Sequence, residues 1–444
     1  MIFWAGRSLC LINCHVFDGE LNSSVLHGTT ITVQFDDDGI GRIAAIGDNP
    51  SSRDVVMDLG GSTVLPGLIN AHCHIFNDGG LRPLGDEVYF RSIRRWPARS
   101  LFLRKIAVNL RSALHAGVTT VRCLGEPHSF DLLIRTQLKK RNAVAPRIIA
   151  AGTGICITGG HAAAISRVAD SPWDVRQAVR QGIREGNDLI KIFSTGGVAD
   201  SRRKGEAGRL QMTPDEIAAA CDEAHRAGLM VASHAQSPKG VLEALTGGVD
   251  TIEHGAELSV ETVALFLNNE KALHGQSALI PTLSPVLHLC GIDPHVTKLP
   301  AQMLENITYV RDGMIVGLRA AKSAGIKIGI GNDASMPAVT HYDFWRELLY
   351  ISAIGAFTPQ ETIHLATAGN AELLGIGHLT GRIAPGLSAD LVAFKDNPTV
   401  DLRALSRPAF VMMEGHFIAE PRVTARIEAV DEALRTIDVI AAVV

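Results

Sequence analysis

Short apolar segments alternate with amphipathic helical segments through the middle of the chain, and this alternation is the strongest constraint on its fold. The apolar segments have the length of buried strands. The candidate strands are Leu65–His74, Thr119–Leu124, Arg147–Ala151, Leu189–Ser194, Met230–His234, Thr251–His254, Ala278–Leu283 and Lys327–Asn332. Helical patterns separate most of them, as at Pro172–Glu185, Pro214–Ala227 and Ser237–Thr246. Eight alternating units predict an α/β fold, a TIM-like (β/α)8 barrel over residues 66–377.

Both ends of the chain carry a different, β-rich pattern. Residues 31–35 alternate apolar and polar side chains, and after a turn residues 42–46 follow as a second strand, which predicts a hairpin. Residues 378–418 have the same character. Because the termini of a domain often lie close together, we expect residues 1–65 and 378–424 to form one small β-sandwich domain. The residue pattern of positions 425–444 predicts a helical tail.

Composition bears on the partners and on the location. The 444 residues carry a formal net charge of −4, so we expect no nucleic acid and no anionic membrane as partner. The sequence contains no uninterrupted run of about 18 apolar residues, so we expect no membrane-spanning helix. The seven cysteines are scattered without a CxxC motif, and the partly apolar start of the chain lacks the basic region of a signal peptide. These features predict a cytoplasmic protein.

His72 and His74 close the first candidate strand. They are two residues apart, so both imidazoles point to the same face of the strand, while Cys73 points the other way into packing. Two neutral imidazoles side by side suit a divalent metal. A chance pattern, or a merely polar strand end, is the alternative that this pair alone leaves open.

Lys191 lies in an otherwise apolar candidate strand, the fourth. A lysine buried there must lose its charge or find a partner, and burial lowers its pKa. A neutral amine can react with carbon dioxide to form a carbamate, whose carboxylate-like group could bridge two metals. The segment equally allows a lysine that reaches past the strand end to solvent.

Three more polar residues stand at strand ends. His234 and His254 close the fifth and sixth candidate strands, and Asp333 follows the eighth. Each has an ordinary alternative, which is a structural histidine in two cases and a helix-capping aspartate in the third. However, catalytic groups of such barrels collect at the C-terminal ends of the strands. Taken together with the first histidine pair and Lys191, they predict a metal site.

These segments resemble the amidohydrolase superfamily over nearly the whole chain. Residues 65–74 look like its first-strand motif, and residues 158–161 and 190–197 resemble the branch with Xaa-Pro and Xaa-Arg/Lys dipeptidases, imidazolonepropionase-like hydrolases and ochratoxin-type amidases. The resemblance implies two divalent metal ions, of which zinc is the expected one. It implies a first metal on His72, His74 and Asp333, a second on His234 and His254, and an N6-carboxylated Lys191 that bridges both. Cys123 stands where relatives commonly have Asp, which affects local packing and none of these ligands.

The resemblance also predicts the reaction. We expect hydrolysis of the amide bond of a dipeptide or N-acyl amino acid by a metal-bridging hydroxide, with Asp333 as general base and then general acid. His161 is a candidate to polarise the substrate carbonyl and His341 a candidate substrate contact, although a structural turn and a surface loop explain them as well. Alternatives are a cyclic amide or imide hydrolase of the imidazolonepropionase kind and a non-catalytic scaffold. Symmetric assembly is common among soluble enzymes, so we expect a homo-oligomer that acts on a small molecule.

Overall fold

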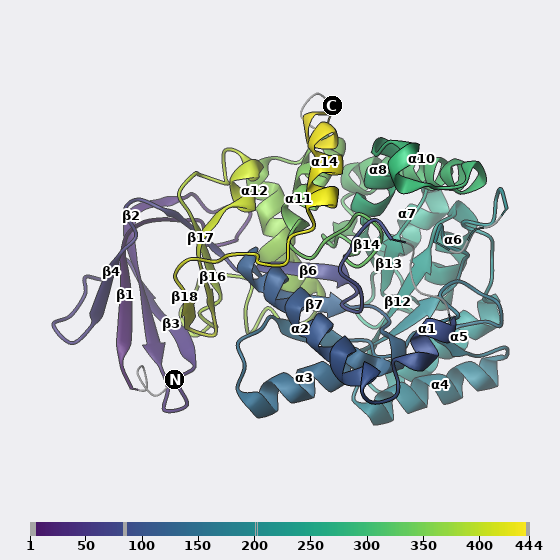
Figure 1. Cartoon of the computed structure of the whole chain (residues 1–444), viewed down its shortest axis with the longest axis horizontal. Helices are drawn as coiled ribbons and strands as arrows, with labels where there is room; N and C mark the ends of the chain where they lie inside the picture. Colours follow the sequence, from purple (N-terminus) through teal and green to yellow (C-terminus); the bar gives the residue numbers. More distant parts are fainter. Residues whose placement is uncertain (1–5, 83–86, 200, 202, 441–444) are drawn as a thin grey trace.

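The computed structural model of the protein describes residues 6–82, 87–199, 201 and 203–440. A β-rich part and a larger part of strands and helices lie side by side (Figure 1). The start of the chain, on which the expected location partly depends, lies outside the described residues. Along the described chain, no helix combines the length and the apolar character that crossing a membrane requires.

One sheet joins strands from both ends of the chain. Its strands run in the order β18-β17-β16-β5-β1-β2-β3, and β4 pairs with β1. They are β1 (Ser8–Val16), β2 (Leu26–Phe35), β3 (Gly41–Ile46), β4 (Val55–Asp58), β5 (Thr63–Pro66), β16 (Leu391–Phe394), β17 (Pro408–Met413) and β18 (His416–Ile418). The predicted hairpin is β2 and β3, and β5 pairs antiparallel with β16. The two β-rich pieces therefore pair with each other, as their patterns predict.

The middle of the chain alternates parallel strands with helices, which confirms the predicted α/β class. The strands are β6 (Leu68–Cys73), β7 (Val118–Cys123), β8 (Arg147–Ala150), β11 (Leu189–Phe193), β12 (Met230–Ala235), β13 (Thr251–His254), β14 (Ala278–Ile280) and β15 (Lys327–Ile328), with the short β9 (Ile155–Cys156) and β10 (Arg167–Val168) beside β11. The helices among them are α1 (Glu87–Ser92), α2 (Ala98–His115), α3 (Phe130–Arg141), α4 (Pro172–Glu185), α5 (Pro214–Arg226), α6 (Pro238–Gly247), α7 (Val260–Leu267), α8 (Ser284–Gly291), α9 (Pro294–Thr297) and α10 (Ala301–Ala324). Helices α11 (Phe344–Gly355), α12 (Pro359–His364) and α13 (Asn370–Leu373) follow β15.

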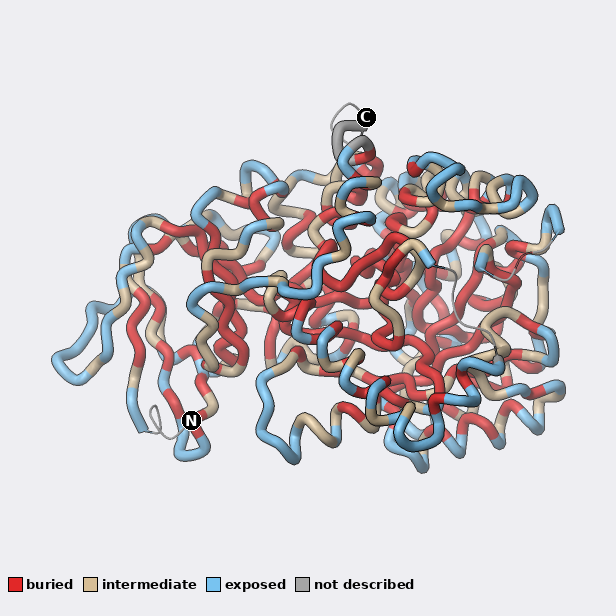
Figure 2. The backbone as a smooth tube through the Cα atoms, in the orientation of Figure 1, coloured by how far each residue is buried: buried red, intermediate tan, exposed pale blue. Residues whose placement is uncertain are grey.

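Hydrogen bonds connect the edges of two parallel sheets. Strands β6-β7-β8 form one sheet, and β10-β9-β11-β12-β13-β14-β15 form the other. The amide of Asp188, just before β11, donates to the carbonyl of Ala150 in β8 at 2.8 Å. At the opposite edges, the amide of Ala71 in β6 donates to the carbonyl of Ile330 at 2.9 Å, and Cys73 bridges to Ala334. In Figure 2 these central strands are buried, while the surrounding helices expose their outer turns.

The observed strands differ most from the expected ones at the first and last positions, while β14 ends at Ile280 rather than Leu283 and the others differ by at most one residue at an end. The first is broken at Gly67, where the chain leaves the mixed sheet as β5 and enters the parallel sheet as β6. A Cβ at Gly67 would clash with the side chain of Thr119, so the close passage requires glycine. The last strand is shorter than expected because the buried side chain of Asn370 accepts from the amide of Ile330 at 3.0 Å, in place of a strand partner.

Within the C-terminal tail, residues 428–440 form a helix that packs on the main body. Helix α14 (Glu428–Ile440) contacts α8, and its side chains Val430 and Leu434 are buried. The Tyr342 hydroxyl accepts from the amide of Ile427 at 2.8 Å and donates to Asp431 at 3.2 Å. Tyr342 follows β15, so the tail anchors the loop that comes after the last parallel strand.

Candidate metal centre

His72, His74 and Asp333 lie together at the ends of the first and last parallel strands. One ligand atom from each side chain lies within 4.8 Å of the others. An oxygen of Asp333 is 3.3 Å from Nε2 of His72 and 3.4 Å from Nε2 of His74. The backbone fixes this placement, because the amide of Asp333 donates to the carbonyl of His72 at 2.8 Å. Gly331 allows the close approach, since a Cβ there would clash with the backbone of His72.

The backbone at two of the polar strand ends has an uncommon conformation. Asp333 has φ 56° and His254 has φ 72°, both in the left-handed region that non-glycine residues rarely adopt. Such positions cluster at functional sites. In addition, the next helix after Asp333 begins only at Phe344, so Asp333 does not cap a helix.

Lys191 is buried inside the parallel strands and does not reach solvent. Its residue is 1% exposed, and Nζ lies 5.1 Å from the centroid of the Phe193 ring. Among the described residues, Nζ has no hydrogen-bond partner. Burial lowers the pKa of Lys191 to about 8, against the opposing influence of Glu253 and Asp333. A substantial fraction of this amine is therefore neutral near physiological pH.

His234 and His254 complete the group of polar strand ends. The ring centroid of His254 lies 4.5 Å from that of His234 and 5.1 Å from that of His72. Burial holds the pKa of both His234 and His254 well below the ordinary value, so both rings are neutral. Nδ1 of His254 lies 2.6 Å from the hydroxyl of Thr282, and Nε2 of His234 is buried without a partner among the described residues. Neutral imidazoles with an open nitrogen are suitable metal ligands.

His72 is supported through its Nδ1 atom by a glutamate, which in turn pairs with an arginine. Neither residue was among the predicted site residues. Oε2 of Glu253 lies 2.6 Å from Nδ1 of His72. Arg122 donates to both carboxylate oxygens of Glu253, at 2.9 and 3.1 Å, and also to the carbonyl of Ala71. Both side chains are fully buried. Burial alone would raise the pKa of Glu253, but Arg122 and His72 outweigh it and lower that pKa, so the carboxylate stays ionised.

The sequence does carry a signal for this pair. Arg122 lies in the apolar segment 118–123, and Glu253 precedes His254 in the short segment 251–254. Two opposite charges in buried strands need each other, since an unpaired buried charge is costly. The signal indicates that partners exist, but it does not indicate that they meet behind His72.

The two candidate substrate contacts lie in different surroundings. His161 lies against the polar strand ends, with its ring centroid 4.3 Å from that of His234 and 5.4 Å from that of Phe193. His341 is buried, its Nε2 lies 2.8 Å from the carbonyl of Asn77, and burial lowers its pKa to about 4. The structure thus brings His161 to the centre, whereas Nε2 of His341 is engaged by the loop after β6.

Comparison with known proteins agrees with this arrangement. Ochratoxinase from Aspergillus niger is 25% identical over 381 residues, which cover 78% of this chain and 73% of that relative. A candidate prolidase from Bifidobacterium longum superposes with a TM-score of 0.85 at 36% identity and covers 97% of this chain and 99% of its own. A Xaa-Pro dipeptidase with methionine bound in its active site superposes with a TM-score of 0.78 at 28% identity, covering 93% of this chain and 100% of its own. Residues 63–419 match the amidohydrolase family model, and the chain belongs to that family.

Proposed function

We propose that the protein is a binuclear metal-dependent hydrolase that cleaves the amide C–N bond of a dipeptide or an N-acyl amino acid. The observation that carries the proposal is the grouping of five side chains of metal-ligand type, four imidazoles and one carboxylate, beside one buried lysine. Those side chains are His72, His74, His234, His254 and Asp333, and the lysine is Lys191. Perturbed ionisable groups that cluster in this way usually mark a functional site.

The fold that we infer is a (β/α)8 barrel over residues 66–377. Support comes from the hydrogen bonds that join β8 to β11 and β6 to the segment after β15, which would close the eight strands into a ring. Residues 1–65 and 378–424 would then form the separate β-sandwich domain, and residues 425–444 the helical tail. Such a barrel places the polar strand ends at one mouth.

The donor set fits two divalent metal ions. His72, His74 and Asp333 would hold one, His234 and His254 the other, and Lys191 would lie between them. Three buried polar atoms of these six side chains lack a hydrogen-bond partner among the described residues, namely Nζ of Lys191, Nε2 of His234 and an oxygen of Asp333, and a cation with a carbamate would satisfy them. Imidazole and carboxylate ligands suit zinc. When bound, such metals lower the pKa of water and polarise a carbonyl.

Lys191 has the properties that carbamate formation needs. Its amine, with a pKa of about 8, is partly neutral and lies beside the ring of Phe193. The nitrogen lone pair would form a bond to the carbon of carbon dioxide as one C=O π bond breaks, and the nitrogen would lose a proton to water. The product would be a carbamate with one negative charge and two oxygens of the kind that bind metals. This change also replaces a buried cation by an anion among neutral histidines.

Asp333 is the residue that we assign to proton transfer. Burial alone would raise its pKa, but the neighbouring histidines outweigh burial and hold the pKa below its ordinary value, so Asp333 is ionised and ready to accept a proton. It would take the proton from the attacking water and deliver it to the leaving amine. His161 would contact the substrate carbonyl beside His234. His341 would contact the substrate from its position near Asn77.

The substrate class rests on the relatives together with this site. Two similar structures are a candidate prolidase and a Xaa-Pro dipeptidase that holds an amino acid, methionine, in its active site. A site that holds an amino acid in such a relative fits a substrate with an amino-acid half. The amide bond to that half is therefore the bond that we expect to be cleaved.

A substrate panel with the zinc-loaded protein tests the proposal. The panel contains Met-Pro, Leu-Arg, N-acetylmethionine, and the cyclic amides hydantoin and dihydrouracil. We expect free amino acid to be released from a dipeptide or from N-acetylmethionine, and this release is detected by mass spectrometry. Protein treated with a chelator should release none. Turnover confined to the cyclic amides would assign the protein to the other kind of hydrolase, and no turnover on any member would refute the proposal.

Glu253→Gln should weaken metal binding while the protein stays folded. Glutamine has nearly the same shape, but it loses the charge that orients His72 and pairs with Arg122. Loss of such a supporting partner typically lowers metal affinity by about 10- to 100-fold. Zinc affinity is measured by competition with a coloured chelator. Asp390→Asn is the matched control, because Asp390 is a buried partner of Arg147 away from the centre; equal loss in both variants would show a general effect of destabilisation.

A further inference from the structure

A hollow separate from the metal centre lies between α2 and α3. It has a volume of about 610 Å³, which falls in the range of about 300–1,000 Å³ that is typical of small-molecule sites. Its floor is apolar, with the buried side chains of Leu103 and Ile134 and the half-buried Ala107. Trp96 lines it as well and is 82% exposed. The hollow thus offers an apolar base and an unusually exposed aromatic ring.

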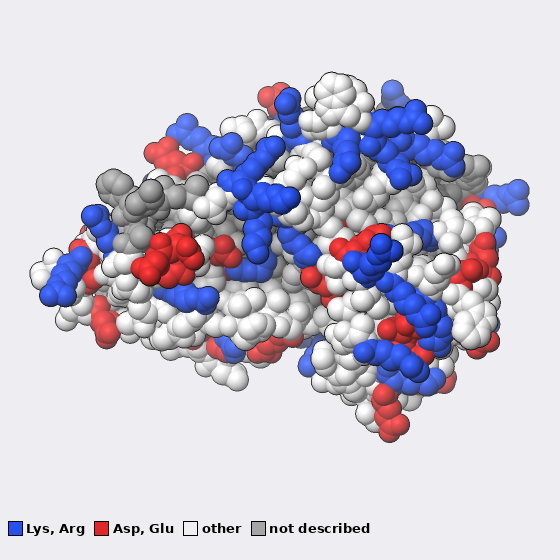
Figure 3. Space-filling model, turned by 90° about the horizontal axis from the view of Figure 1, so that it is seen from below, with Lys and Arg blue, Asp and Glu red and all other residues white. Residues whose placement is uncertain are grey.

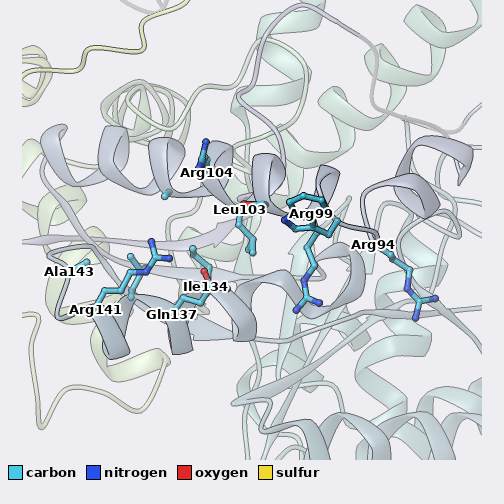
Figure 4. Close-up of a pocket in the computed structure, with 12 residues that line it drawn as sticks. Arg94, Arg99, Leu103, Arg104, Ile134, Gln137, Arg141 and Ala143 are labelled. Carbon is cyan, nitrogen blue, oxygen red and sulfur yellow. The ribbon is translucent and has the colours of Figure 1, made fainter.

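Four arginines line the same hollow. They are Arg94, Arg99, Arg104 and Arg141. Figure 4 shows Arg99 extending from α2 and Arg141 extending from the end of α3 into the space between the two helices. No acidic side chain lines the hollow, and among the residues that the structure describes none of the four arginines forms an ion pair.

This lack of counter-charges is local. On the neighbouring α4, Arg176 pairs with Asp222 and Arg180 pairs with Glu223, so the chain does neutralise exposed arginines elsewhere. Residues 88–125, by contrast, contain no Asp or Glu, although the whole chain has 46 acidic residues and a net charge of −4. Lys and Arg side chains gather toward the upper right of Figure 3 with few acidic ones between them. The overall charge therefore conceals a strongly cationic face.

We propose that this hollow binds a small organic anion, a carboxylate or phosphate carried on an aliphatic or aromatic body. Guanidinium groups bind carboxylate and phosphate oxygens through paired N–H donors, and like charges that repel one another are relieved when an anion binds between them. The apolar body of the ligand would cover Leu103, Ala107 and Ile134 and would pack against Trp96. Because the site is concave and has a buried floor, it suits such a compact ligand better than the flat surface of a membrane. The site does not depend on the metal centre.

The test uses three probes that separate charge from apolar area. These are 1-naphthyl phosphate, inorganic phosphate and 1-naphthol, each titrated calorimetrically into the full-length protein. We expect 1-naphthyl phosphate to bind at one site per chain, at least about tenfold more tightly than either of the others, because only it uses both parts of the hollow. Binding should weaken with added salt.

Two kinds of variant locate that binding. Arg99→Gln with Arg141→Gln should weaken 1-naphthyl phosphate binding by about tenfold or more, whereas the same charge change at Arg403 and Arg407, on the β-rich part, should leave it within about twofold. Ala107→Phe places a phenyl ring over the apolar floor and keeps every arginine, so it should also weaken binding. Unchanged binding in Ala107→Phe would overturn the proposal, since the anion would then sit elsewhere.

Vesicles distinguish the pocket from a membrane-docking face. The protein is sedimented with phosphatidylcholine vesicles that contain phosphatidylserine, and with phosphatidylcholine alone. We expect it to stay in the supernatant in both cases. Co-sedimentation with the anionic vesicles that Arg99→Gln with Arg141→Gln removes, together with no binding of 1-naphthyl phosphate, would overturn the proposal in favour of an anionic lipid surface.

Discussion

Replacing Lys191 with alanine is expected to remove bound metal and activity together. In the proposed site the buried amine would lie between the two metals, and a carbamate on it would supply ligand oxygens. Without it, His234 and His254 would be two neutral imidazoles, too few to hold a cation tightly. Because bound catalytic metals typically contribute several kcal/mol to transition-state stabilisation, turnover should fall by about a thousandfold or more. Metal content is measured by inductively coupled plasma mass spectrometry after gel filtration.

A second variant and a spectroscopic signal keep this result interpretable. Lys191→Met preserves the stem of the side chain against Phe193 and should lose metal as alanine does, while Lys239→Ala, an exposed lysine on α6, should change nothing. In the native protein supplied with carbon-13 bicarbonate, a carbamate carbon should be visible by NMR, and Lys191→Met should lack it. A folded Lys191→Ala protein with its full metal content would rule out the binuclear assignment.

Asp333→Asn is expected to lose turnover while it keeps most of its metal. The amide oxygen of asparagine can still face the cation, and the amide of residue 333 still bonds to the carbonyl of His72, so the loop conformation should survive. What disappears is a carboxylate that can accept and return a proton, which is typically worth about 10²- to 10⁴-fold in rate. The loss should appear in kcat, with KM little changed.

The pH profile gives this prediction an independent readout. The pKa of Asp333 is held low by its histidine neighbours, so the acidic limb of the profile that depends on its ionisation should be absent in Asp333→Asn. Asp78→Asn is the control, because Asp78 follows the first parallel strand and pairs with Lys105 at 3.2 Å outside the group of candidate metal ligands. Normal turnover in Asp333→Asn would exclude the proton-transfer role.

The arrangement of the parallel strands could be predicted because its signals are local. Each strand is a short apolar run, and its direction follows from the helix that comes after it. The period-two geometry of a strand places His72 and His74 on one face, and the common polarity of parallel strands brings His234 and His254 to the same end. In the structure these four histidines lie close together. The sequence patterns were therefore most informative about which side chains are neighbours in space.

Other features could not be predicted because they depend on contacts across the interior. Arg122 and Glu253 lie on β7 and β13, and only the three-dimensional arrangement shows that they support His72. The break at Gly67 depends on the passage of Thr119, and the short last strand depends on Asn370, far along the chain. The metal identity, carboxylation of Lys191, homo-oligomeric state and cytoplasmic location remain predictions.

The sheet that joins both ends of the chain has a consequence for biosynthesis. β5 emerges from the ribosome long before its antiparallel partner β16, because most of the parallel strands and helices are encoded between them. Until then an apolar strand edge stays unpaired, and such edges favour aggregation. Closing so long a loop also slows folding, because its entropy is lost before the contacts form. We therefore expect the unpaired edge of β5 to need protection from aggregation until β16 has been made.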